Sequence, residues 1–250
     1  MIAWPALLGL EPGHLAIIAA IVVAGALVQG TIGIGFGIVV VPGLTLLAPA
    51  TLPATPLLLA LPLTVLVAHR ERGAIDRQGL PVLLIGRVVG TAAAVVLLVW
   101  LPEPSLEILF GLVILGVIPL SLARPQVPFT RTNQLAAGAT SGLFATTAAI
   151  GGPPAALLYQ NRPGPELRAT LGVLFLVGGL FSIVGLLVAQ RLTVEHLVLA
   201  LVLGPAMAIG FALSRPLARI LDAGWLRPAV LAIAGAAGAM AVVRGVLAML

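Results

Sequence analysis

The sequence predicts an all-helical membrane protein that crosses the bilayer several times. Of its 250 residues, 60% are hydrophobic and only 8% are charged, whereas soluble domains carry roughly 25% charged residues. No Asp, Glu, Lys or Arg lies between Glu11 and Arg70. Because a membrane-spanning helix needs about 20 apolar residues, the chain has room for roughly eight to ten membrane segments.

Five apolar segments in the first half are expected to be helices. Each is bounded by charged residues, by glycine or by proline, which end apolar runs or helices. The segments are residues 15–31, 38–48, 56–68, 80–101 and 105–123.

Five further segments in the second half are expected to be helical for the same reasons. Two of the ten, 38–48 and 153–159, are too short to cross about 30 Å of hydrocarbon at 1.5 Å per residue. We therefore expect these two to be half-helices that end near the midplane of the membrane or at a cavity. The segments of the second half are residues 133–150, 153–159, 166–190, 195–214 and 227–249.

A run of glycines interrupts the first apolar stretch at residues 30–42. Gly33, Gly35 and Gly37 fall at alternate positions, and Pro42 closes the run. Glycine is unfavourable inside a helix but lets backbone approach a ligand closely. A broken helix exposes backbone N–H and C=O groups that hydrocarbon cannot satisfy, so it persists only where protein, water or a solute bonds them. The run is thus a candidate transport site, with close helix crossing as the alternative role of its glycines.

A second interruption is predicted at residues 141–154. Gly151 and Gly152 precede two prolines, which cannot continue a helix. Hydroxyl side chains one to three turns earlier would supply a polar pocket, unless they bond only to their own helix backbone. The candidate substrate-binding residues here are Ser141, Thr146, Thr147, Gly151, Gly152, Pro153 and Pro154.

The two halves of the sequence show the pattern of an internal repeat. Residues 30–42 align with 142–154, and residues 72–76 align with 191–195, in the same order. We therefore expect two membrane repeats, 1–131 and 132–250, although chance similarity between glycine-rich and alanine-rich segments is an alternative.

The loop arginines favour an inverted relation between the repeats. An even number of crossings per half divides these arginines almost equally between the two sides of the membrane. An odd number leaves only Arg191 opposite the rest, as the positive-inside rule expects. We prefer inverted repeats, with both termini outside and loops around 70–79, 124–132, 161–168 and 215–227 in the cytoplasm.

Two arginines, Arg87 and Arg244, lie inside apolar segments that contain no Asp or Glu. A charge within the membrane is costly and is a functional hypothesis by default. The positive N-terminal ends of half-helices also favour an anion. A bound anion is therefore the natural partner, above all for Arg87; the alternative is that either side chain reaches the membrane interface.

Several other functions are disfavoured. The chain has no Cys, and His14, His69 and His196 show no ligand spacing, so we expect neither a metal nor a cofactor. Sequence motifs for a nucleophile or a metal-bound water are missing, so we expect no catalytic residues and no enzyme. The net charge of +5 is explained by loop arginines and does not predict nucleic-acid binding. Without carboxylates in the spans, coupling would come from the membrane potential.

At residues 30–42 and 141–154 the chain resembles the sulfite exporter TauE/SafE family of multi-pass permeases. The likeness extends to residues 72–76, to the helix containing Gly86 and Gly90, and to residues 168–170. Phe36 and Ala148 depart from the family pattern at positions that would reshape the gap. The resemblance implies movement of sulfite or organosulfonates across the inner membrane.

The resulting hypothesis is an inner-membrane carrier of a small anion that works by alternating access. Its partners would be the anion, the lipid bilayer and, in a homodimer, a second copy of the chain. Two alternatives remain: an anion channel that uses the same broken helices, and a membrane scaffold that binds no anion.

Overall fold

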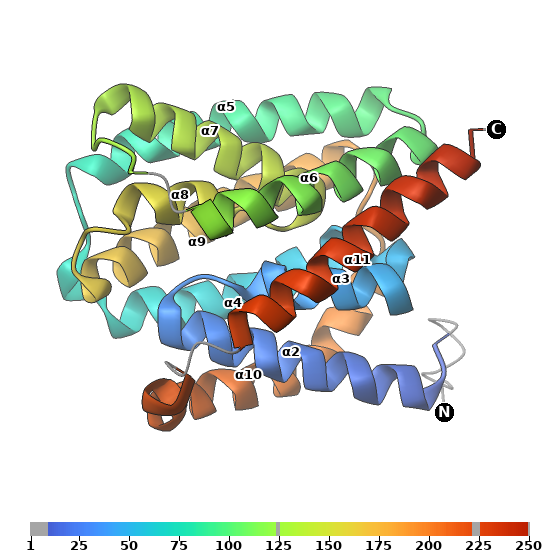
Figure 1. Cartoon of the computed structure of the whole chain (residues 1–250), viewed down its shortest axis with the longest axis horizontal. Helices are drawn as coiled ribbons and strands as arrows, with labels where there is room; N and C mark the ends of the chain where they lie inside the picture. Colours follow the sequence, from blue (N-terminus) through green and yellow to red (C-terminus); the bar gives the residue numbers. More distant parts are fainter. Residues whose placement is uncertain (1–9, 124–125, 222–225, 250) are drawn as a thin grey trace.

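The computed structural model describes residues 10–123, 126–221 and 226–249, and these residues contain no β-strand. The described part of the first half forms five α-helices and two short 3₁₀ turns (Figure 1). Each helix corresponds to one predicted apolar segment. They are α2 (Pro12–Ile32), α3 (Phe36–Leu47), η1 (Pro49–Thr51), α4 (Ala54–Arg70), η2 (Arg72–Ala74), α5 (Gly79–Trp100) and α6 (Glu103–Ala123).

The described part of the second half again forms five α-helices at the predicted segments. Two expected loops are partly helical: α9 begins at Gly164, within the loop expected at 161–168, and α10 continues to Leu221, within the loop expected at 215–227. A charged residue such as Arg215 ends an apolar run, but it does not interrupt the hydrogen bonds of a helix. The helices are α7 (Arg131–Ala148), α8 (Gly152–Tyr159), α9 (Gly164–Val188), α10 (Val194–Leu221) and α11 (Leu226–Leu247).

Among the described residues, five helices are long and apolar enough to cross a membrane, and shorter apolar helices accompany them. Many large apolar side chains on these helices face outward, including Trp100 at 81% exposed and Leu201 at 76%. Water would disfavour so much exposed apolar surface, whereas lipid solvates it. The prediction of an all-helical polytopic membrane protein is confirmed. The spanning candidates are Pro12–Ile32, Gly79–Trp100, Pro104–Leu122, Gly164–Val188 and Val194–Ser214.

The two halves of the chain interlock. Helix α5 packs along α7, α10 packs along α2, α4 packs against α9, and α6 packs against α11. One buried apolar cluster draws its residues from α2, α3, α4 and α10, and another draws from α5, α7, α8 and α9. Each cluster thus combines three helices of one half with one helix of the other.

Glycines permit the close approach of α5 and α7. A Cβ atom on Gly86 would overlap the carbonyl of Leu135, and one on Gly90 would overlap the carbonyl of Ala139. Gly138 on α7 faces the α5 backbone in the same way. Small residues on facing helices let two backbones touch, which is the main source of packing attraction between helices in lipid.

The loop between α4 and α5 is tied to the second half through Asp76. Its carboxylate accepts hydrogen bonds from the Tyr159 hydroxyl at 2.8 Å and from the Gln78 and Gly79 N–H groups, while its own N–H donates to Thr170 Oγ1. Partial burial raises the pKa of Asp76, but these hydrogen bonds and the charge of Arg162 lower it overall. The bonds therefore stabilise the fold above the ordinary pKa of an aspartate, and this stabilisation is lost as the pH falls through the lowered value.

Substitution of Gly90 tests the contact between α5 and α7. We expect Gly90→Ala to lower the free energy of unfolding by about 1–3 kcal/mol, since the added methyl group overlaps the α7 backbone. Gly204→Ala is the matched control, because a Cβ atom there meets nothing within 4 Å. Thermal unfolding in detergent measures both. Equal stability of the two variants would contradict the close contact.

Candidate functional site

The connection from α2 to α3 requires glycine. Helix α2 ends at Ile32, and both Gly33 (φ +91°) and Gly35 (φ +117°) lie in the left-handed region before α3 begins at Phe36. Side chains other than glycine are strained there. The Phe36 N–H at the start of α3 donates to Gln29 Oε1 at 3.2 Å. A buried side chain of α2 therefore satisfies one of the free N–H groups at the α3 N-terminus.

The connection from α7 to α8 is also a sharp turn. Helix α7 ends at Ala148, Ala149 is left-handed (φ 56°), and α8 begins at Gly152 with proline in its first turn. Proline suits this position because the first N–H groups of a helix have no partner within it. Helix α8 contains only 8 residues.

These two connections lie against each other in the interior. A Cβ atom on Gly37 would overlap the carbonyl of Ala149, and one on Gly152 would lie 3.5 Å from the Cβ of Ile34. The start of α3 and the start of α8 therefore meet in one region, although they are far apart in the sequence.

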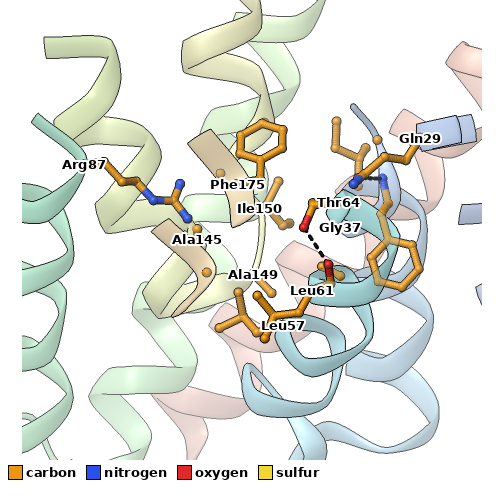
Figure 2. A pocket seen from close by; sticks show the side chains of 17 residues that line it. Gln29, Gly37, Leu57, Leu61, Thr64, Arg87, Ala145, Ala149, Ile150 and Phe175 are labelled. Carbon is orange, nitrogen blue, oxygen red and sulfur yellow. Dashed lines mark hydrogen bonds between the residues drawn. The ribbon is translucent and has the colours of Figure 1, made fainter. Parts of the chain in front are cut away.

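A cavity of about 50 Å³ lies where these helix starts meet (Figure 2). Figure 2 shows Arg87 at one edge of this pocket and Gln29 at the other. Most of the lining is glycine or apolar. The lining residues are Gln29, Gly35, Phe36, Gly37, Ile38, Leu57, Ala60, Leu61, Thr64, Arg87, Ala145, Ala149, Ile150, Gly151, Gly152, Phe175 and Gly179.

The guanidinium of Arg87 is buried at the edge of the cavity, with the residue only 1% exposed. Its Nη1 donates to the carbonyl oxygen of Ser141 at 2.8 Å and to Ser141 Oγ at 2.7 Å. Ser141 Oγ in turn donates to the carbonyl of Gly151 at 2.6 Å. Arg87 Nε is buried and has no hydrogen-bond partner among the described residues.

No carboxylate neutralises Arg87 in the described part of the chain. The ion pairs there join Glu71 to Arg70 and Arg168, and Glu166 to Arg162. A buried charge is costly unless it is paired, and removing a partner from a buried pair typically costs about 3–5 kcal/mol. Arg87 therefore presents an unneutralised positive charge at the edge of the cavity.

The structure brings five of the sequence-predicted site residues to the cavity wall: Gly35, Gly37, Arg87, Gly151 and Gly152. A sixth, Ser141, lies behind the wall and holds Arg87 in place.

The other predicted residues lie outside the described lining. Gly33 packs against Arg168, and Pro42 is buried within α3. Thr146 Oγ1 shares a hydrogen bond with Ser182 Oγ at 2.7 Å, and Thr147 Oγ1 donates to the carbonyl of Leu143 in its own helix. Pro153 and Pro154 are buried in the first turn of α8.

Most of the cavity lining was missed in the sequence. The missed residues include Gln29, Thr64 and Phe175, and Gly178 on α9, which makes room for the Arg87 side chain, since a Cβ atom there would overlap Arg87 Nε. Gln29 was detectable as an isolated amide in an apolar stretch, and it aligns with Ser141 when 30–42 is laid on 142–154. The others depend on tertiary contacts that leave no local pattern.

A double-mutant cycle tests whether Gly178 accommodates Arg87. We expect Gly178→Ala to cost about 1–3 kcal/mol of unfolding free energy, because the methyl group displaces the buried guanidinium. In an Arg87→Ala background the same substitution should cost much less, because the overlapping atoms are gone. Thermal unfolding of the four proteins in detergent gives the coupling. Additive costs would contradict this contact.

Comparison with known proteins places the chain in a family. The family model described as sulfite exporter TauE/SafE matches residues 17–241. The matched range includes both connections, the cavity lining and Arg87. No curated protein and no solved structure matches the chain. The chain therefore belongs to the sulfite exporter TauE/SafE family, whose members are membrane transporters of sulfite-type anions.

Proposed function

We propose that this protein is a secondary carrier of a small sulfur-containing oxyanion, such as sulfite or an organosulfonate, and that the anion binds beside Arg87. The observation that carries this proposal is the buried guanidinium at the cavity, which no described carboxylate neutralises. An oxyanion beside it would neutralise the charge, and charge-assisted hydrogen bonds between a guanidinium and an oxyanion are stronger than neutral ones.

The pattern of helix packing supports two repeats, 1–131 and 132–250. When α2 to α6 are matched in order with α7 to α11, the packing of α5 on α7 corresponds to that of α10 on α2. The contact of α5 with α9 likewise corresponds to that of α10 with α4, and α2 with α3 to α7 with α8. Helices α4 and α9, and α6 and α11, are equivalent pairs that pack on each other. With five helices per half, repeats of this kind have opposite orientations in the membrane.

The loop arginines support an orientation in the cell inner membrane. The α4–α5, α6–α7 and α8–α9 connections lie at one end of the molecule, at the left of Figure 1, and the α9–α10 connection, which contains Arg191, lies at the other end. Loops rich in arginine remain on the cytoplasmic side. In this account the arginine-rich end faces the cytoplasm, α2 begins and α11 ends outside, and the protein works as a single copy or as a homodimer in the lipid bilayer.

The mechanism we propose is alternating access to one fixed site. The first turns of α3 and α8 meet at the cavity, and the N-terminal end of a helix carries a partial positive charge that favours an anion. These two turns and Arg87 come from both halves of the chain. A rocking motion of one half against the other would therefore expose the same site first to one side of the membrane and then to the other.

Counterflow in proteoliposomes tests the carrier hypothesis. Vesicles preloaded with unlabelled sulfite and diluted into radiolabelled sulfite should show a transient overshoot with the wild-type protein. Arg87→Gln should reduce the overshoot at least about tenfold, since a neutral side chain cannot stabilise the buried anion. Arg244→Gln is the matched control, because Arg244 is exposed and lies outside the cavity.

Each contrary outcome has a clear meaning. Sulfite flux without exchange of labelled for unlabelled anion would replace the carrier with a channel. No flux and no binding of sulfite, sulfate or sulfonates would favour a scaffold. An unchanged overshoot in Arg87→Gln would remove Arg87 from the site.

A further inference from the structure

We infer that the cavity selects a compact oxyanion with a single negative charge, so that hydrogen sulfite is bound in preference to the sulfite dianion and to organosulfonates with long tails. This inference rests on the proposed function and specifies its substrate. It follows from the charge, the size and the polarity of the cavity.

The charge of the site is set by one residue. Among the described residues that line the cavity, Arg87 alone carries a formal charge, and the polar remainder is Gln29 and Thr64. The titratable groups on the surrounding helices lie outside this lining: His14 on α2, His69 and Arg70 on α4, Arg131 on α7, Tyr159 on α8, and Glu166 and Arg168 on α9.

A ligand with a single negative charge therefore makes the occupied site electrically neutral. One monoanion beside Arg87 leaves no net charge inside the membrane, whereas a dianion leaves an uncompensated negative charge there. Uncompensated charge in a membrane interior is strongly disfavoured. The apolar walls contributed by Leu57, Leu61 and Phe175 offer few polar groups to stabilise that extra negative charge.

The size of the cavity limits the anion. Roughly 10–15 Å³ holds one water molecule on this measure, so a cavity of about 50 Å³ holds roughly three to five non-hydrogen atoms. Hydrogen sulfite and methanesulfonate both fit within this range. A sulfonate with a chain of several carbons exceeds it unless the walls move.

Competition among unlabelled anions tests the inference in the same counterflow assay. Methanesulfonate and sulfate have the same number of non-hydrogen atoms but different charges, so they form the matched pair for charge. Methanesulfonate and propanesulfonate share a charge and differ in length, so they form the pair for size. We expect methanesulfonate to compete at least about tenfold better than either of the others, and Arg244→Gln to keep this ranking.

The pH dependence gives an independent readout. Hydrogen sulfite loses its proton near neutral pH, whereas nitrate keeps its single charge and arginine keeps its proton. The apparent affinity for total sulfite should therefore fall from mildly acidic to mildly alkaline pH, while competition by nitrate stays constant.

The outcomes separate this inference from the proposed function. Two results, obtained with counterflow present, would overturn the charge selectivity and leave the carrier hypothesis intact. One is that sulfate competes as well as methanesulfonate. The other is that the affinity for total sulfite is unchanged or rises at alkaline pH. Equal competition by propanesulfonate would overturn the size limit. If counterflow is absent, thermal stabilisation of the purified protein by the same anions still ranks them. Stabilisation by methanesulfonate over sulfate would then support the selective site without the carrier, and equal or no stabilisation would overturn it.

Discussion

The proposed transport site depends on one buried positive charge. Arg87 lies in the middle of α5 and is almost fully buried, and no described carboxylate pairs with it. Such a charge is tolerated only if the surrounding structure holds it in a defined place and a partner completes it. Ser141 supplies two hydrogen bonds to one nitrogen of the guanidinium. Arg87 also lines the cavity where the α2–α3 and α7–α8 connections meet.

The architecture around Arg87 is built from close backbone contacts. Gly138 and Gly142 bring α7 against α5, Gly178 brings α9 against the Arg87 side chain, and Gly37 brings the start of α3 against Ala149. Each contact would be lost if a larger residue replaced the glycine. The contacts join helices of both halves, so a relative movement of the halves changes the surroundings of Arg87. In the proposed mechanism, this charge links occupancy of the cavity to the arrangement of the helices.

Much of the fold was predictable because the apolar segments are long and sharply bounded. Glycine and proline marked both helix interruptions, and Arg87 stood out as a charge in an apolar run. The end of α10 was not predictable, since the helix continues beyond the apolar run at Ser214.

The remaining site residues were harder to predict from the sequence. Whether a threonine hydroxyl faces a cavity or its own helix depends on tertiary packing. Thr147 bonds to its own helix, and Thr146 bonds across to α9. Phe175 and Gly178 gave no signal, because their roles arise only when α9 packs beside α5.

Locating a bound anion tests the central claim most directly. Selenite has the shape of sulfite, and its selenium atom gives an anomalous diffraction signal in crystals of the purified protein. We expect one selenium position in the cavity between the starts of α3 and α8, with an anion oxygen within hydrogen-bonding distance of the Arg87 guanidinium. Selenium bound only elsewhere, with no anion oxygen beside Arg87, would contradict the proposed site.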